Sequence, residues 1–438
     1  MKRKEKAVIF LIIFLSIACG VRAQESLDWG KCVEEAKRRH PNLAAAAEKI
    51  AGSKASKEIT RSATLPQITG NASEITSKNL SSGNSTASSQ SSSSSSSGGS
   101  STDYTYGATG QQLLFDGFKT SFDLSGAERN IIASRYNYDV TSSDIRLKLR
   151  TAFANLLRAQ ELLKVTEEIL ARRKQNFGLV KLRYEGGQEH KGSLLLSEAD
   201  VADAEYKVGQ AKRNIYSSQI ALIKELGRSN YTSADMIASG DFEISNPETE
   251  RPDFERLAES NPLLRQLVAL KEAAKYGVKS AGAQFFPQVF ATGSLDNSNT
   301  DEFPAQNDWS IGTTLTLPIF DGANRFATLS KAKATLGQTE ADEKSGRDGV
   351  ILTMANTWAN FQDAVKNVSV QKKFLYAARE RSKIAEAEYS IGFLAYDNWI
   401  IIEDNFVNAK TAYLNAETGA LVAEANWIQA KGGTLDYD

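Results

Sequence analysis

The chain has little cysteine, and this excludes disulfides as the source of its stability. Only Cys19 and Cys32 occur among 438 residues. Cys19 falls inside an expected N-terminal leader, so the mature chain would keep Cys32 alone and could form no intramolecular disulfide. An exported protein of this length without disulfides must be held by packing or by assembly.

Residues suited to catalysis or metal binding are equally scarce. The two histidines, His40 and His190, are 150 positions apart, show no metal-ligand spacing and are expected at the surface. Serine is abundant, but no G-x-S-x-G sequence occurs. The segment "GGQEHKG" (186–192) follows no strand and lacks Walker A spacing. We therefore expect no enzyme, no cofactor and no metal.

The chain also lacks an excess of either charge. Its 52 Lys and Arg residues face 53 Asp and Glu residues, for a formal net charge of −1. Nucleic-acid binding needs a concentrated basic patch, so nucleic acid is not an expected partner.

The N-terminus holds a hydrophobic run of secretory length. Basic residues precede "AVIFLIIFLSIA" (7–18), and "VRA" (21–23) is a small-x-small cleavage site. This pattern predicts a signal peptide over residues 1–23, with an uncleaved anchor as the alternative. "SIAC" (16–19) leaves lipidation of Cys19 open. No later stretch predicts a transmembrane helix, so we expect a chain that is soluble outside the cytoplasm or inserted as β-strands.

Proline is absent between residues 67 and 246 and again after Pro318. A proline inside a helix costs roughly 3 kcal/mol, so such tracts can hold long helices. From Leu149 onward, apolar positions recur at alternating steps of three and four, with charged residues between them. A helix from Lys119 to Arg183 would be about 100 Å long. An ordinary bundle is the alternative, but this length favours a coiled-coil-like cylinder.

The chain repeats itself at one fixed offset. "RYEGG" (183–187) corresponds to "EYSIG" (388–392), and "AFANLLRA" (152–159) corresponds to "TWANFQDA" (357–364). These pairs share an offset of 205 residues, as does the recurring "FDG". One offset held over about 70 residues indicates an internal duplication.

Upstream, the offset becomes 221, between "LPQITGNAS" (65–73) and "FPQVFATGS" (286–294). The Ser-rich segment 81–102 accounts for the difference and is expected to be a disordered loop. Four strand-like segments flank this loop and its shorter counterpart, and "WSIGTTLTLPIF" (309–320) alternates most clearly. Each is about ten residues, which suits a tilted strand that crosses a bilayer.

The "FDG" sequences stand where the second strand of each pair gives way to a long helix. Asp116-Gly117 and Asp321-Gly322 are expected to form strand-to-helix turns. Glycine gives the backbone its freedom there, and aspartate can cap the helix and complement its dipole.

Four strands cannot close a barrel, and open edges are not tolerated in lipid. If the strands enter a membrane, several chains must share one barrel. The order of the motifs then resembles the TolC family of outer-membrane efflux and secretion channels. The resemblance rests on "LDWGKCVEEAKRRHPNLAAA" (27–46), the two "PQ" strand starts, the "FDG" turns and the tyrosine-glycine helix breaks.

The resemblance implies a mainly α fold with a β membrane part. Each chain would supply long antiparallel helices to an α-helical barrel and four strands to a 12-stranded barrel shared by a homotrimer. It also implies an outer-membrane location in a Gram-negative bacterium, extending into the periplasm. The implied partners are outer-membrane lipid, a periplasmic adaptor and an inner-membrane transporter. The channel would be a passive exit duct for efflux or type I secretion.

The resemblance also assigns roles at the helix breaks. Tyr184, Gly187, Tyr389 and Gly392 would form the periplasmic tip where the adaptor docks, with simple helix termination as the plainer interpretation. The paired aspartates that constrict the pore in some members are replaced by Asn398 and Ile401. An acidic ring built from nearby residues is the remaining candidate for the constriction, and an ordinary solvated helix face is the alternative. The candidates are Asp397, Asn398, Glu403 and Asp404.

The expected organisation has a signal peptide and two repeats. The first repeat, 24–245, has strands at about 65–79 and 103–115 and helices at about 118–183 and 193–227. The second, 246–438, has strands at about 286–295 and 309–320 and helices at about 323–389 and 395–431. An exported coiled-coil structural or adhesin-like protein is the alternative function. The two membrane-length strand pairs argue against it, since a fibre does not need them.

Overall fold

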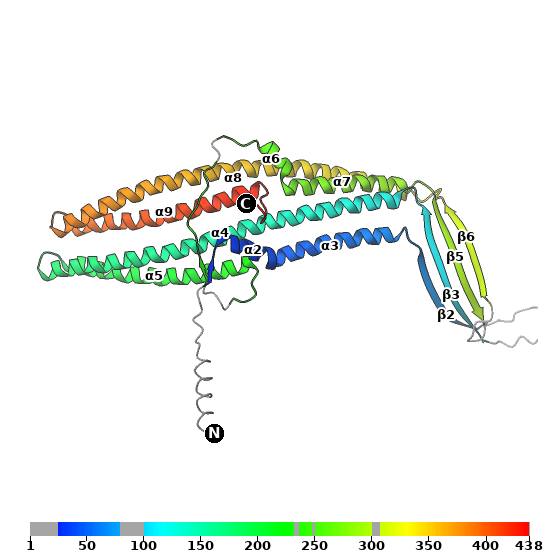
Figure 1. Ribbon diagram of the computed structural model, residues 1–438, viewed down its shortest axis with the longest axis horizontal. Helices are drawn as coiled ribbons and strands as arrows, with labels where there is room; N and C mark the ends of the chain where they lie inside the picture. The colour runs from blue at the N-terminus through cyan, green and yellow to red at the C-terminus, as the bar shows by residue number, and fades with distance from the viewer. Residues whose placement is uncertain (1–24, 79–99, 232–235, 248–249, 300–306, 438) are drawn as a thin grey trace, which may run out of the picture. The chain divides into compact units, whose positions relative to one another are not determined.

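The computed structural model describes residues 25–78, 100–231, 236–247, 250–299 and 307–437 (Figure 1). The expected signal peptide, Cys19 and most of the Ser-rich loop lie outside these residues. The described chain is mainly helical and carries one four-stranded sheet, which confirms the predicted fold class. Cys32 is a buried, free cysteine.

The described residues form two compact units, and each unit draws on both sequence repeats. The first unit comprises the described parts of Met1–Ala47, Tyr136–Leu264 and Arg347–Asp438, and the second comprises those of Glu48–Arg135 and Arg265–Gly346. The compact units therefore differ from the two repeats, because each repeat contributes helices to both.

The first unit is built on four long helices. They are α4 (Lys119–Glu185), α5 (Lys191–Leu226), α8 (Asn324–Ser390) and α9 (Tyr396–Ala430); α4 and α8 begin in the second unit. In Figure 1, α5 runs back beside α4, and α9 runs back beside α8. Lys174 of α4 pairs with Glu205 of α5 at 2.8 Å. These helix ends lie within two residues of the predicted ones.

Short elements complete the first unit. They are β1 (Glu25–Leu27), α2 (Trp29–Arg39), β4 (Met236–Ala238), α6 (Phe254–Ser260) and the first residues of α3 (Pro41–Ser62) and α7 (Pro262–Ala283). Strands β1 and β4 pair in parallel. Three apolar clusters form the core of this unit: one around Leu149 and Leu222, one around Met354 and Trp427, and one around Tyr389 and Trp399.

The duplication is visible in matching contacts. Gly227 ends α5 at φ +76° and Gly432 follows α9 at φ +82°, one offset apart. A Cβ on Gly227 would lie 2.8 Å from His40 Cα, and a Cβ on Gly432 would lie 3.6 Å from Asn261 Cα. His40 and Asn261 correspond at the upstream offset of 221. In both halves, therefore, the end of a returning helix packs against the residue just before a helix that begins with proline. These helices are α5 and α3 in the first half, and α9 and α7 in the second.

The second unit contains the remainder of α3 and α7, the beginnings of α4 and α8, and the sheet. Its strands are β2 (Gln67–Lys78), β3 (Ser100–Phe115), β5 (Gln288–Asn299) and β6 (Asn307–Thr316), in the antiparallel order β2-β3-β5-β6. Strand β3 includes residues 100–102, which the sequence had assigned to the Ser-rich loop. Strand β6 ends before Leu317 and Ile319, which were predicted to continue it. Pro318 has no amide hydrogen to donate to a strand ladder, and this explains the early end.

The register gives the sheet two chemically different faces. Side chains alternate along each strand, so residues paired across strands share a face. The apolar face carries Ile68, Ala72, Tyr106, Ala108, Ala291, Leu295, Trp309 and Ile311. The opposite face is mainly polar and carries Thr69, Asn71, Ser73, Thr105, Thr109, Ser294, Asp296 and Ser310, together with Ile75, Leu113 and Phe290. One acidic residue, Glu74, lies on the apolar face. The large apolar side chains of the first face are exposed, and Ile311 keeps 81% of its surface accessible.

Candidate functional site

The two turns that join the long helices have the same backbone geometry. Gly187 (φ +71°) and Gly392 (φ +86°) adopt the left-handed conformation that stops each helix. The Gly187 amide donates to Tyr184 O, and the Gly392 amide donates to Tyr389 O. The next amide in each turn, from Gln188 or Phe393, reaches back to a carbonyl five residues earlier. Both turns are Schellman caps, and any other residue at these glycines would be strained.

The two tyrosines that precede these glycines lie in different surroundings. Tyr389 is buried and stacks on Trp399, with ring centroids 4.2 Å apart, and Tyr396 meets both rings edge-on. Tyr184 is exposed. Sequence reasoning missed Trp399 and Tyr396 as members of this site. One offset earlier the chain has Leu194 and Lys191, so a comparison of the halves would have marked both positions.

Residues from one turn also bind the other turn. Arg183 Nη1 donates to Tyr389 O at 3.0 Å, and its guanidinium lies 4.9 Å from the centre of the Tyr389 ring. The Tyr389 hydroxyl donates to Glu189 Oε2 at 3.1 Å. Burial and the Glu189 charge raise the pKa of Tyr389, so it stays a neutral donor. The structure thus brings the α4–α5 turn and the α8–α9 turn into direct contact.

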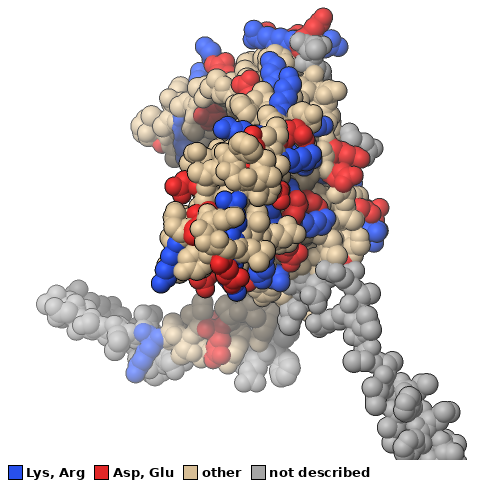
Figure 2. All heavy atoms as spheres, turned by 90° about the vertical axis from the view of Figure 1, so that its left-hand side faces the viewer, with Lys and Arg blue, Asp and Glu red and all other residues tan. Residues whose placement is uncertain are grey.

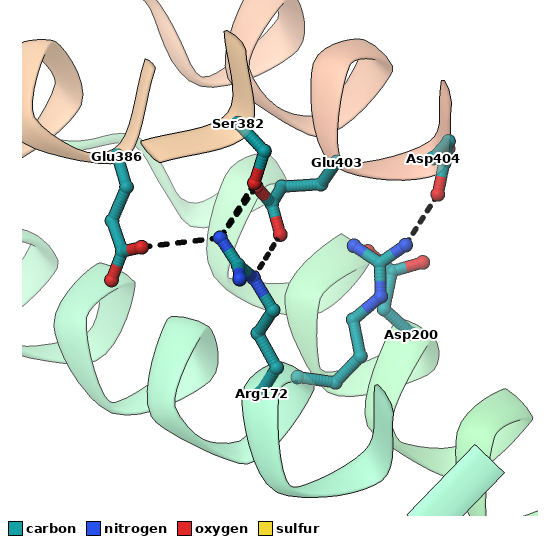
Figure 3. A network of polar contacts seen from close by, with 7 residues as sticks. Arg172, Asp200, Ser382, Glu386, Glu403 and Asp404 are labelled. Atoms are coloured by element: carbon teal, nitrogen blue, oxygen red, sulfur yellow. Dashed lines mark hydrogen bonds and ion pairs between the residues drawn. The ribbon is translucent and has the colours of Figure 1, made fainter. Parts of the chain in front are cut away.

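A buried ionic network lies next to the turns (Figure 3). Arg172 donates through Nε and Nη2 to the Glu403 carboxylate, and through Nη2 also to Ser382 Oγ at 2.6 Å and Glu386 Oε2 at 3.1 Å. Ser382 donates to Glu403 Oε1 at 2.6 Å. The Glu403 side chain is only 2% exposed, so its charge is balanced by Arg172 within the protein. The network joins α4, α8 and α9.

A second arginine on α4 extends the network. Arg173 Nη2 donates to Asp404 Oδ1, and its Nη1 lies 3.9 Å from Asp200 Oδ2 of α5. Burial raises the pKa of Asp200, and the nearby Asp404 charge raises it further, while Arg173 acts in the opposite direction. Tyr396 lies close to Asp200, and burial raises the pKa of its hydroxyl. These contacts connect α4 to both returning helices.

These contacts change the expectation of an acidic constriction. Glu403 is buried and bound to Arg172, and Asp404 is bound to Arg173. Glu403 is therefore not available as a free carboxylate, nor is it part of a solvated helix face. Asp397 and Asn398, in the first turn of α9, are exposed. The structure does not bring these two residues together with the other pair.

The surface at the turns mixes charges of both signs with apolar side chains. Figure 2 views this end of the helices and shows Lys and Arg interspersed with Asp and Glu. Phe393 is 84% exposed, and Ile391 and Leu182 are also exposed. Such a surface presents apolar contact points without a dominant charge.

The "FDG" turns have closely matching geometry. Asp116 Oδ2 accepts from the amide of Thr120 at 2.8 Å, and Asp321 Oδ2 accepts from the amide of Arg325 at 3.2 Å. Gly117 and Gly322 have φ of +70° and +64°. The residues that follow them, Phe118 and Ala323, also have positive φ, at 67° and 69°. Each aspartate thus binds an orphan amide of the first helical turn.

The histidines act as hydrogen-bond acceptors at helix starts. His190 Nδ1 accepts from the Ser193 amide, and His40 Nδ1 accepts from the Asn42 amide, each at 3.2 Å. The prediction that His40 is a surface residue was wrong, because it is only 6% exposed and lies beside Glu225. The described residues contain no group of His, Cys, Asp and Glu arranged to hold a metal.

Among the residues that the structure describes, no helix combines the length and apolar character needed to cross a membrane.

Residues 32–228 and 254–433 match the model of the family described as outer membrane efflux protein. The chain therefore belongs to the outer membrane efflux protein family, a family of transport proteins located in the outer membrane of Gram-negative bacteria. This confirms the resemblance that the motifs indicated.

Individual relatives are distant in sequence. The chain is 23% identical to the outer membrane efflux protein BepC of Brucella suis over 328 residues, which cover 73% of this chain and 67% of BepC. It is 27% identical to the outer membrane protein OprJ of Pseudomonas aeruginosa over 242 residues, 52% of this chain and 49% of OprJ. The matches thus span about half to two thirds of these relatives.

The fold is shared more completely. The MtrE outer membrane channel of Neisseria gonorrhoeae superposes with a TM-score of 0.78 at 20% identity, and the superposition covers 93% of this chain and 90% of MtrE. At this identity the likeness establishes the fold alone.

Proposed function

We propose that this outer-membrane efflux protein is the passive exit duct of a tripartite efflux or type I secretion system. Cargo would pass from an inner-membrane pump through a homotrimer of this chain to the cell exterior. The observation that carries the proposal is the sheet of the second unit. It has one apolar exposed face, one polar face, and two edge strands, β2 and β6, that each have a single neighbour in the described chain.

A sheet with an apolar face and open edge strands can enter lipid only as part of an assembly of several chains. Unpaired backbone groups at a strand edge cannot face hydrocarbon, so β2 of one copy would pair with β6 of the next. Three copies would close a barrel of 12 strands. The apolar face with Ile311 and Trp309 would contact lipid, and the polar face with Ser294 and Ser310 would line the lumen.

We assign adaptor docking to the helix turns at Tyr184, Gly187, Tyr389 and Gly392. The exposed Phe393 and Ile391 supply apolar contacts beside Gly392, and the paired turns form one surface through Arg183 and Tyr389. The exposed Asp397 and Asn398 are the candidates for a constriction, because Glu403 is already neutralised inside the protomer.

A photoreactive residue tests the docking assignment. Phe393 is replaced by a photo-cross-linking phenylalanine analogue, and Tyr216, an exposed aromatic residue of α5 away from the turns, serves as the matched control. Irradiation of living cells should link position 393, but not 216, to a periplasmic adaptor identified by mass spectrometry. Links to the adaptor from 216 alone would contradict the assignment.

A further inference from the structure

A cavity of about 370 Å³ lies in the first unit, far from the helix turns. Its wall comes from α2, α4, α8, α9, the segment 245–247, and Lys431 and Tyr437 after α9. Between Arg150 and Gly187 the continuous helix α4 covers roughly 50 Å at 1.5 Å per residue, so the cavity is separate from the candidate docking site. Its volume falls within the range of small-molecule sites, about 300–1,000 Å³.

Three cations line this cavity, opposed by one carboxylate. Arg146 and Arg150 are four positions apart on α4 and so share one face of the helix. Neither makes an ion pair or hydrogen bond with another described residue. Lys431 is the third cation. The carboxylate belongs to Glu424, which already accepts a hydrogen bond from Ser245. The cavity therefore holds an excess of positive charge.

Aromatic rings, rather than carboxylates, hold these cations in position. The Arg146 guanidinium lies 5.8 Å from the Trp29 ring centre and 5.3 Å from that of Tyr437. Arg150 lies 4.8 Å from the same Trp29 ring. Stacking fixes a guanidinium but leaves its in-plane N–H donors unused. The cavity thus contains two oriented forks of donors.

Two like charges in a partly buried cavity repel each other, and Glu424 and Glu243 offset this repulsion only in part. Arg146 is only 8% exposed. Burial and the Arg150 charge lower its pKa, which reflects the cost of keeping both groups charged. A bound anion would remove that cost.

We propose that this cavity binds a small organic anion, with a carboxylate or phosphate group placed between Arg146 and Arg150. The planar guanidinium matches both groups in a bidentate geometry. At about 30 Å³ per water molecule, the volume exceeds that of a single inorganic ion. The Trp427 and Tyr437 side chains line the remaining space and can contact an apolar part of the ligand.

Calorimetric titration of the detergent-extracted, full-length protein tests this proposal. Citrate and inorganic phosphate are the probes, at ionic strength held constant with sodium chloride. We expect saturable binding of citrate, weakened at least tenfold by Arg146→Gln or Arg150→Gln. Lys148→Gln is the matched control, because Lys148 is exposed on α4 between the two arginines and does not line the cavity. It should leave the affinity unchanged.

Three results would overturn the proposal: no saturable heat with either probe, equal weakening by Lys148→Gln, or full affinity in the Arg146→Gln, Arg150→Gln double variant. Saturable binding of phosphate but not citrate would still support the site and assign it to phosphate groups. If Arg146→Gln fails to fold, as judged by circular dichroism, Lys431→Gln is measured in its place and should also weaken binding. Citrate should raise the melting temperature of the unmodified protein but not that of Arg150→Gln.

Discussion

At the residue scale, the pair of Arg172 and Glu403 sets how α4, α8 and α9 meet near the turns. Removing one member of a buried pair leaves an uncompensated charge, which typically costs 3–5 kcal/mol. Arg172 is partly exposed and keeps Glu386 as a second partner, so the cost should fall near the lower end. The pair therefore contributes more to the alignment of the helices than its surface neighbours do.

Glu403→Ala should thus destabilise the helix ends by about 3 kcal/mol, within the range for broken buried pairs. Glu386→Ala is the control, since Glu386 binds the same arginine but is half exposed, and it should cost about 0–1 kcal/mol. Thermal unfolding of the two variants in detergent, followed by circular dichroism, provides the comparison. Equal melting temperatures for both variants would contradict this account of the network.

Gly178 inside α4 and Gly187 in the turn that follows it should respond to alanine with opposite changes in stability. Gly187→Ala places a Cβ at φ +71° and should destabilise by about 1–2 kcal/mol. Gly178→Ala, in the helix interior with no atom within 4 Å of the new Cβ, should stabilise by about 0.5–1 kcal/mol. Melting temperatures of the two variants should therefore move in opposite directions; a rise for Gly187→Ala would refute the Schellman cap.

His40 should make stability depend on pH. Burial lowers the pKa of His40, although Glu225 opposes this effect, so the unfolded chain binds a proton more readily than the folded one. Stability is then full above the unfolded pKa of about 6.5 and decreases as pH falls below it. His40→Asn, which installs the residue of the second half, should reduce the loss of melting temperature between pH 7.5 and 5.5. An unchanged loss would exclude His40 as its source.

The sequence offered no means to predict which individual polar side chains of the candidate site are buried. The sequence places Glu403 on a long helix among other charged residues, and nothing local distinguishes it from exposed Asp397. Its burial depends on Arg172, which is 231 positions away. The same holds for His40, whose neighbour Glu225 comes from α5. Tertiary partners of this kind leave no periodic pattern in one sequence.

At the element scale, helices and strands could be predicted because their patterns are long and repeated. The proline-free tracts and the common offset located all four long helices to within two residues. The glycines at the turns and the aspartates of the "FDG" sequences act on the backbone of their immediate neighbours. Their positions could therefore also be predicted from the sequence. The end of β6 was missed because alternation continues past Thr316, while Pro318 removes the hydrogen bond that the ladder needs.

The two faces of β6 should respond differently to charge. Ile311→Arg puts a cation on the apolar face, halfway along β6, where arginine facing lipid costs about 2–4 kcal/mol. Ser310→Arg, on the polar face, loses its hydrogen bond to Ser294, worth about 1 kcal/mol, but avoids lipid. Outer-membrane levels measured by quantitative immunoblotting should fall sharply for Ile311→Arg only. A greater loss for Ser310→Arg would mean that the faces are assigned the wrong way round.

At the scale of the whole molecule, the account requires assembly. A sheet with an apolar face and two edge strands cannot enter lipid as a single copy, whereas the proposed ring of three copies would pair every edge. The long helices of each copy, which belong to the same family fold, would then surround one continuous passage. Export by this passage would need no catalytic residue, in keeping with a channel whose energy comes from a separate pump.

The most direct test of that claim is the native mass of the protein extracted by mild detergent from the outer-membrane fraction. Native mass spectrometry, with detergent removed in the gas phase, should give three times the mass of the mature chain. A mass of one chain, or recovery only in the soluble fraction, would contradict the shared barrel and with it the proposed duct.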